Sequence, residues 1–377
     1  MNENLRRLSD AGVAIWLDGL SREQLRSGGL AALVREKHVV GVAASPAVFQ
    51  RALGAGTSYD EQLRDLAIRR VTADEAIRMI AAADVREACD VLRPAYDMTD
   101  GADGRVSIDV DRRLGHKAAE LAAEARQLSW LVDRPNLLIS IPATAGGLPA
   151  VTATLAEGIS VNVTLIPSVA RYRAVTDAFF AGLERAADNG RDLSRIASVA
   201  SVLVSPVDTE VDKRLWKIGT DQAAALRGKA AVAGARLVYA AFEEAFASER
   251  WKALEGGGAR PQRPLWASTA MQDPYYPDTR YVDELVVQGV VSAMPEATLE
   301  MVADHGQITG DTVRGSYEDS WETFAALAGL GVSQDDVARA LEGNDAGRPG
   351  ASWSGLVSSV ESALRRSPQA SGVTAGG

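Results

Sequence analysis

The chain has 377 residues, of which 46% are hydrophobic, so it can bury one large core with insertions or two smaller cores. Its 40 Lys and Arg are scattered among 50 Asp and Glu, which gives a formal net charge of −10. Without a basic block, electrostatic capture of nucleic acid is disfavoured, and we expect a small-molecule substrate and no nucleic-acid partner.

Cys89 is the only cysteine, so an intramolecular disulfide is excluded and nothing indicates an oxidising compartment. The amino-terminal residues MNENLRRLSDAG lack the charged-then-apolar pattern of a signal peptide. No apolar run approaches the roughly 18 residues that are needed to span a bilayer. We therefore predict a cytoplasmic protein with no membrane partner.

Eight short runs rich in β-branched residues, most of them ending at a polar residue or proline, are predicted as strands. They span residues 13–18, 39–45, 106–111, 137–143, 159–166, 200–207, 264–269 and 290–295. Stretches with helical apolar spacing lie between them, such as 116–132, 168–190 and 211–247. Strand alternating with helix predicts a parallel sheet, and eight repeats predict a closed barrel. The expected fold class is therefore α/β, a TIM (β/α)8 barrel with additional terminal and inserted helices.

Turn-rich sequences at 97–105 and 252–264 are predicted loops between these elements. The first, DMTDGADGR, superficially suggests a calcium loop, but Ala102 occupies the third position counted from Asp100. We therefore predict neither a metal site nor a cofactor. Residues 1–365 are predicted to form a single barrel domain, followed by a disordered tail over residues 366–377.

Polar residues at the predicted strand ends define the expected functional face, because the chemistry of such barrels sits at the carboxyl ends of the strands. Each residue alone is equally consistent with a capping or loop-anchoring role. Together, two carboxylates and several hydroxyls at one mouth indicate an acid/base and hydrogen-bonding site for a polar ligand. The set comprises Asp18, Ser45, Asp109, Ser140, Asn162, Thr164, Ser205, Ser268 and Thr269.

Several sequence blocks, in order along nearly the whole chain, resemble the longer bacterial type of transaldolase. They include WLDGLSR (16–22), GRVSIDVDRRL (104–114), RPNLLISIPATAGGLPA (134–150), AEGISVNVTLIPS (156–168), SVLVSPVDTEVDKRL (201–215) and MPEATLEMVADHG (294–306). The resemblance implies a barrel of the class I aldolase kind. In that family a lysine on the fourth strand forms a Schiff base with a ketose phosphate.

The chain departs from the family pattern at several positions of the implied site. The family's Ile-Lys-Ile-Pro-Ala-Thr reads Ile-Ser-Ile-Pro-Ala-Thr at 139–144, so Ser140 stands where the lysine is expected, and a hydroxyl cannot form an imine. Ser45 replaces an amide on the second strand, and Asp109 replaces a glutamate on the third. Pro206 replaces the arginine that grips the substrate phosphate, and Gln272 stands at a basic position.

Two further observations bear on the implied site: where the lysines lie, and which of the family's polar residues are kept. The six lysines all fall in helical or loop stretches away from the expected mouth: Lys37, Lys117, Lys213, Lys217, Lys229 and Lys252. The retained residues resemble the family's acid/base and hydrogen-bonding groups: Asp18, Asn162, Thr164, Ser168 and Ser205.

Three functions fit these residues. The first is a repurposed enzyme that uses imine-free acid/base chemistry, such as dehydration, cyclisation, isomerisation or condensation, on a small unphosphorylated carbonyl or hydroxyl compound. The second is an inactive homologue that binds a partner or metabolite, and the third is residual transaldolase activity through an unforeseen lysine. We predict the first, and we expect a homodimer for which the Tyr-rich stretch DPYYPDTRY (273–281) is a candidate interface.

The residues expected to act in this site fall into two groups. The predicted catalytic residues are Asp18, Asp109, Ser140 and Thr164. The predicted substrate-binding residues are Ser45, Asn162, Ser168, Ser205, Ser268 and Gln272.

Overall fold

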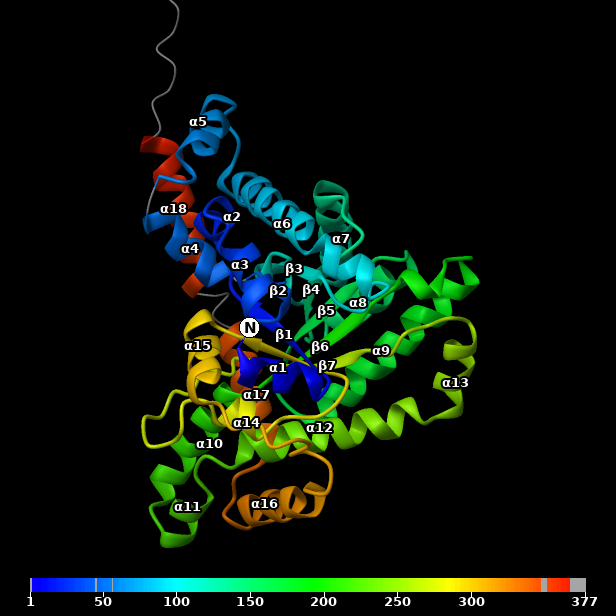
Figure 1. Ribbon diagram of the computed structural model, residues 1–377, viewed down its shortest axis with the longest axis vertical. Helices are drawn as coiled ribbons and strands as arrows, with labels where there is room; N and C mark the ends of the chain where they lie inside the picture. The colour runs from blue at the N-terminus through cyan, green and yellow to red at the C-terminus, as the bar shows by residue number, and fades with distance from the viewer. Residues whose placement is uncertain (1, 45, 56, 347–350, 367–377) are drawn as a thin grey trace, which may run out of the picture.

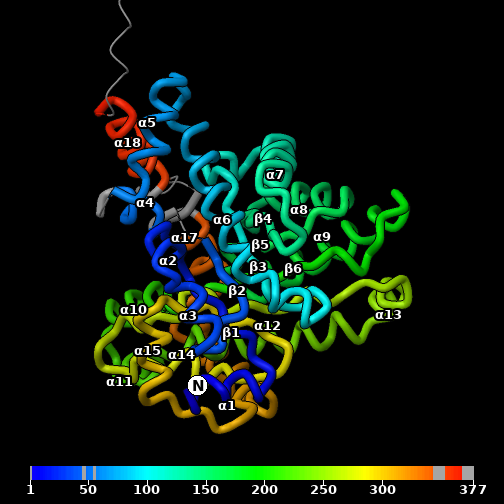
Figure 2. Tube along the Cα trace, turned by 45° about the horizontal axis from the view of Figure 1, so that its top comes forward, coloured from blue at the N-terminus to red at the C-terminus, as the bar shows by residue number. Residues whose placement is uncertain are grey.

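Eight parallel strands close into a barrel in a computed structural model that describes residues 2–44, 46–55, 57–346 and 351–366. The strands follow one another around the barrel in chain order (Figure 1, Figure 2). The last strand pairs with the first. This confirms the predicted TIM barrel. The strands are β1 Val13–Asp18, β2 Val39–Ala43, β3 Arg105–Asp109, β4 Leu137–Pro142, β5 Val161–Ile166, β6 Ser198–Leu203, β7 Arg263–Ala267 and β8 Val290–Met294.

Helices surround the barrel, and several are additional to the eight that the simplest barrel needs (Figure 1). In the first half of the chain they are α1 Glu3–Asp10, α2 Arg22–Arg26, α3 Gly29–Glu36, α4 Pro46–Ala55, α5 Asp60–Ile68, α6 Ala73–Met98, the 3-10 helix η1 Arg112–Leu114, α7 Ala118–Val132, α8 Gly147–Ala156 and α9 Val169–Asp188. In the second half they are η2 Leu193–Arg195, α10 Ser205–Ile218, α11 Asp221–Leu226, α12 Ala230–Phe246, α13 Glu249–Gly256, α14 Arg280–Asp283, α15 Glu296–His305, α16 Tyr317–Gly329, α17 Gln334–Ala346 and α18 Ala351–Arg366. Every helix of the described part falls short of the length or the apolar character that a membrane span requires.

The predicted sixth strand, residues 200–207, is placed too far along the chain. The strand ends at Leu203, and α10 begins at Ser205. Pro206 lies in the first turn of this helix, where its missing N–H has no intrahelical partner to lose and its fixed φ favours the helix. The predicted loop at 252–264 is also partly wrong, because α13 continues to Gly256.

The carboxyl-terminal helix α18 packs against helices from early in the chain. It lies beside α4, α5 and α6 (Figure 2), and a satellite apolar cluster joins Phe49 to Trp353, Leu356 and Val360. Apart from Arg366, which ends α18, the predicted tail over residues 366–377 lies outside the described residues. That residues 1–365 form one domain stays a prediction.

The barrel interior and the outer core are built from alternate residues of each strand. Leu138 belongs to the small cluster inside the barrel, whereas Ile139 and Ile141 belong to the large core beneath the helices. Because side chains alternate between the two faces of a strand, Ser140 shares the inner face with Leu138. The sequence alternation of β4 therefore directs Ser140 to the barrel interior.

Trp16 belongs to the apolar cluster inside the barrel and leaves no room for a side chain at position 41 of the neighbouring strand. It is fully buried, and a Cβ built on Gly41 of β2 would collide with its indole ring. The register between β1 and β2 shifts at this point, where Trp16 pairs with Gly41. Glycine at position 41 thus permits the large indole to fill the barrel.

We expect Gly41→Ala to destabilise the protein by about 1–3 kcal/mol, the usual cost of overpacking a well-filled core. Urea denaturation of the full chain measures this change. Gly256→Ala is the matched control, because a Cβ at Gly256 meets open space at the end of α13. Equal stability of the two variants would contradict this account of the barrel interior.

Candidate active site

The four predicted catalytic residues lie toward the carboxyl ends of four strands. Asp18 ends β1, Asp109 ends β3, and Ser140 and Thr164 lie late in β4 and β5. The strand register places Ser140 between Asp109 and Asn162, and Thr164 next to Pro142. Parallel pairing therefore gathers these side chains at one end of the barrel.

At this end of the barrel, Asp18 has a pKa well above that of an ordinary aspartate. Burial, and after it the negative charge of Asp109, raise its pKa to about 6. The cations Arg112 and Arg51 oppose this shift without cancelling it. Near neutral pH the Asp18 carboxyl can therefore both accept and donate a proton.

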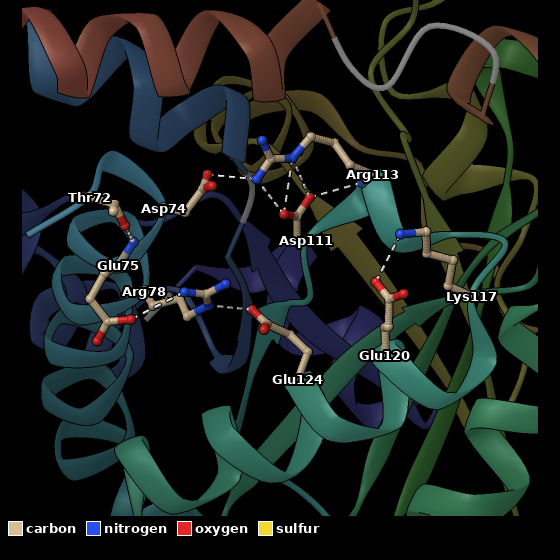
Figure 3. Close-up of polar contacts among 9 residues, drawn as sticks. All are labelled: Thr72, Asp74, Glu75, Arg78, Asp111, Arg113, Lys117, Glu120 and Glu124. Atoms are coloured by element: carbon tan, nitrogen blue, oxygen red, sulfur yellow. Dashed lines mark hydrogen bonds and ion pairs between the residues drawn. The ribbon is translucent and has the colours of Figure 1, made fainter.

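Asp109 is held by an arginine that follows it in the same loop. Arg112 donates from Nε and Nη2 to Oδ2 of Asp109, at 3.2 and 2.8 Å. Asp111 caps η1 by accepting a hydrogen bond from the Arg113 backbone N–H. The Arg113 side chain also lies between the carboxylates of Asp111 and Asp74, which ties the loop to α6 (Figure 3).

Ser140 lies beside the hydrogen-bonded side chain of Asn162 inside the barrel. Its side chain is 2% exposed, and its Oγ has no hydrogen-bond partner among the described residues. Asn162, on the neighbouring strand, accepts from the Ser201 hydroxyl at 2.7 Å and donates to the Ser107 hydroxyl at 3.4 Å. The Asn162 amide is thus fixed in orientation, whereas the Ser140 hydroxyl can bond to a ligand.

The predicted substrate-binding residues have more varied environments. The Ser168 hydroxyl caps α9 by accepting from the Arg171 backbone N–H at 3.2 Å. Ser205 is buried at the start of α10, and its N–H donates to the carbonyl of Ser268, which has a positive φ of 59°. Gln272 is exposed and donates to the Ala270 carbonyl. Ser45 lies outside the described residues.

The sequence analysis did not identify two parts of the site. Arg112, which lies inside the block GRVSIDVDRRL three residues after Asp109, could have been found as a loop cation at the strand end. An apolar cavity of about 50 Å³ also adjoins Asp109 and is walled by Phe49 and Trp353. The sequence carries no signal for it, because Trp353 reaches the barrel only through the packing of α18.

The lysines lie in helices or at their ends rather than on strands. All six lie within the described ranges, and none is on a strand. Lys117, at the start of α7, forms an ion pair with Glu120 at 3.0 Å (Figure 3). Lys37 pairs with Glu300 at 2.8 Å, and Lys252 pairs with Glu249 at 2.6 Å.

We expect Asp18→Asn to stabilise the protein at pH 8 by up to about 3 kcal/mol. The folded pKa near 6 exceeds the ordinary value of 3.8, so the folded state holds its proton more tightly than the unfolded state. Wild-type stability therefore falls as the pH rises from about 4 to 6, and Asn removes this loss. Urea denaturation at pH 4 and pH 8 tests the difference, with exposed Asp188→Asn as the control. An Asp18→Asn effect that is the same at both pH values would contradict the raised pKa.

Proteins of similar sequence are named for a single activity. The chain is 60% identical to "Transaldolase" of Thermobifida fusca (strain YX), over 97% of this chain and 99% of that protein. It is 58% identical to "Transaldolase 1" of Streptomyces avermitilis, over 96% of each chain. It is 57% identical to "Transaldolase 2" of Streptomyces coelicolor, over 97% of this chain and 98% of that protein.

These relatives overturn the predicted function. The departures at Ser140, Pro206 and Gln272 led us to expect a repurposed enzyme for an unphosphorylated substrate, with an inactive homologue as the alternative. That interpretation is wrong, because relatives that share most of their residues with this chain over nearly its full length are named transaldolase. Replacement of a few side chains does not outweigh this overall likeness.

A family model also matches the chain over nearly the whole barrel. The model described as transaldolase/fructose-6-phosphate aldolase matches residues 15–359, which contain almost all of β1 and every later strand. The match and the nearly full-length relatives agree with the closed barrel. The chain therefore belongs to the transaldolase/fructose-6-phosphate aldolase family.

Proposed function

We propose that this protein is a transaldolase, an enzyme that moves a short ketol unit from a ketose phosphate to an aldehyde. The observation that carries this proposal is Asp18, an acid/base group with a pKa of about 6 at the carboxyl ends of the strands. Transaldol transfer needs such a group, because one hydroxyl loses a proton as the donor is cleaved and another gains one as the product forms. The names of the relatives support the same reaction.

We further propose that Ser140 takes the position of the family's Schiff-base lysine, so that the transfer proceeds without an imine on β4. Three observations support this second proposal. Ser140 lies on the inner face of β4, as Leu138 does, and its Oγ has no hydrogen-bond partner among the described residues. None of the six lysines lies on a strand. An alcohol cannot condense with a ketone to an imine, so the ketone would remain a carbonyl throughout.

The proposed steps use groups of this site only. Asp18 takes the proton of the donor hydroxyl that lies β to the carbonyl, and the carbon–carbon bond between the α and β carbons breaks. The electron pair moves to the carbonyl oxygen as an enolate, which the Ser140 hydroxyl stabilises by donating a hydrogen bond. The enolate carbon then attacks the acceptor aldehyde, and Asp18 returns the proton to the new hydroxyl.

Asp109 and Arg112 adjust the pKa of Asp18 in this cycle. The Asp109 carboxylate raises the pKa of Asp18, and Arg112 limits that rise while donating two hydrogen bonds to Asp109. This balance keeps the Asp18 pKa near the working pH, where general acid/base catalysis is most effective.

Two expectations from the sequence remain proposals. The first is a cytoplasmic location. The second is a homodimer through residues 273–281, where Tyr275 is 91% exposed and offers a contact surface. Tyr281 does not contribute to that surface, because it is buried and donates a hydrogen bond to Asp208 at 2.8 Å.

We expect the wild-type protein to release glyceraldehyde 3-phosphate from fructose 6-phosphate when an aldose phosphate is present as the acceptor. Asp18→Asn should lower kcat by about 10²–10⁴-fold, because the acid/base group is lost. A coupled assay for the released triose phosphate measures both proteins, with Asp188→Asn as the control of equal charge change. Failure of the wild type to turn over would refute the transaldolase proposal.

Borohydride trapping tests the absence of an imine separately from activity. Incubation with fructose 6-phosphate and borohydride should leave the wild-type mass unchanged, whereas Ser140→Lys should gain an adduct. Burial at position 140 would lower the pKa of the new amine and raise its reactive free-base fraction. Ile139 and Ile141 contribute little to this effect, because they face the outer core.

Ser140→Met is the matched control, because it has a long side chain without an amine and should give no adduct. A wild-type adduct on any lysine would refute the imine-free route while leaving the transaldolase proposal intact. The two experiments therefore fail independently.

A further inference from the structure

A cavity of about 560 Å³ lies at the amino-terminal ends of the strands, opposite the carboxylates described above. Its lining includes Arg105 and Leu137, the first residues of β3 and β4, and Ser160, which directly precedes β5. Arg195 at the end of η2, before β6, and Arg260, before β7, complete this side of the barrel. The volume falls within the range of roughly 300–1,000 Å³ that is typical of small-molecule sites.

Arg105 is the unusual member of this lining. It is 2% exposed, and its Nε and Nη2 both donate to the Gly101 carbonyl, at 2.8 and 2.5 Å. Its guanidinium carbon lies 5.1 Å from the centre of the Tyr96 ring. Its Nη1 has no hydrogen-bond partner in the part of the chain that the structure describes. A buried cation that donates only to a neutral carbonyl is costly, and an anion in the cavity would compensate it.

Arg105 forms no ion pair among the described residues, and the guanidinium groups of Arg263 and Arg260 lie near it. Burial, together with the neighbouring cations Arg263 and Arg260, lowers its pKa to about 10, while Tyr96 and Asp103 act in the opposite direction. The group therefore stays charged at neutral pH in a locally positive field. Such a field attracts an anion although the whole chain carries a net charge of −10.

Four further arginines line the cavity with carboxylate partners that they can exchange. Arg93 pairs with Asp97, Arg134 with Asp90, Arg195 with Asp192 and Arg260 with Asp100. The four aspartates are more than half exposed, and ion pairs of this kind contribute only about 0–1 kcal/mol. A multiply charged ligand can therefore recruit these guanidinium groups at little cost.

We propose that this cavity binds a small phosphate-bearing anion, with Arg105 as its buried ligand and the surrounding arginines closing over its outer charges. Guanidinium groups match phosphate oxygens with paired N–H donors, which explains why arginine rather than lysine lines the cavity. Ser160 adds a hydroxyl whose oxygen already accepts from the Ala197 N–H and whose hydrogen remains available.

This site is distinct from the catalytic mouth. β3 runs from Arg105 at the cavity to Asp109 at the mouth, so the full length of the strand separates the two charged groups. The proposal does not depend on the transaldolase proposal, because it rests on residues at the other end of the barrel.

Calorimetric titration of the full chain with pyrophosphate at low ionic strength tests the site. The wild type should bind one pyrophosphate, and Arg105→Gln should weaken the affinity at least tenfold. Arg195→Gln combined with Arg260→Gln, at more accessible positions, should also weaken it at least tenfold, so the test survives if Arg105→Gln fails to fold. Arg173→Gln, an exposed arginine of α9 that pairs with Glu244, is the control and should bind as the wild type does.

A mouth variant separates this site from the catalytic end. Arg112→Gln should leave pyrophosphate affinity unchanged, because Arg112 lies beside Asp109. Absence of wild-type binding would overturn the proposal. Binding that is lost in Arg112→Gln but retained in the cavity variants would overturn it as well, because the anion would then occupy the mouth.

Discussion

Closure of the parallel sheet is the constraint on which the rest of this molecule depends. Because β1 pairs with both β2 and β8, every strand has two hydrogen-bonded neighbours and the sheet has no free edge. Each strand must then present alternate residues to a narrow interior. Trp16 fits into that interior only because Gly41 has no side chain, and the charged residues of β3 lie at the two ends of the strand.

The inner face of β3 carries a charged residue at each end of the strand. Arg105, Ser107 and Asp109 occupy every second position, so they share the inner face. Ser107 lies in the middle and accepts a hydrogen bond from Asn162, while the cation begins the strand and the carboxylate ends it. The barrel thus has an arginine-lined cavity at one end and the carboxylates of the candidate active site at the other.

The acidic mouth is tolerated because the loops around it supply compensating cations. Burial and the proximity of Asp109 disfavour the charged form of Asp18, which moves its pKa toward neutrality. Arg112 offsets part of that cost, and the ion pairs of Arg113 with Asp111 and Asp74 hold its loop against α6. In the proposed reaction, the same electrostatic cost that weakens the fold above pH 6 provides a proton donor and acceptor.

The sequence alone determined the barrel and much of its mouth. β-branched runs identified all eight strands, and single polar residues inside such runs located Asp18, Asp109 and Ser140, because alternation along a strand is a local property. Predictions from local sequence patterns were wrong where tertiary packing determines the structure. Residues 204–207 look like a strand, but α10 begins at Ser205. Side-chain departures alone also pointed away from the activity for which the relatives are named.

Only the tertiary structure decided how charges from distant segments act on one another. The raised pKa of Asp18 requires β1 to lie near the end of β3, and the unpaired Nη1 of Arg105 is visible only when the chain around it is folded. The wall that Trp353 forms beside Asp109 likewise depends on α18 docking across more than half the chain. Burial and through-space electrostatics depend on which segments are neighbours, and no local sequence pattern specifies that.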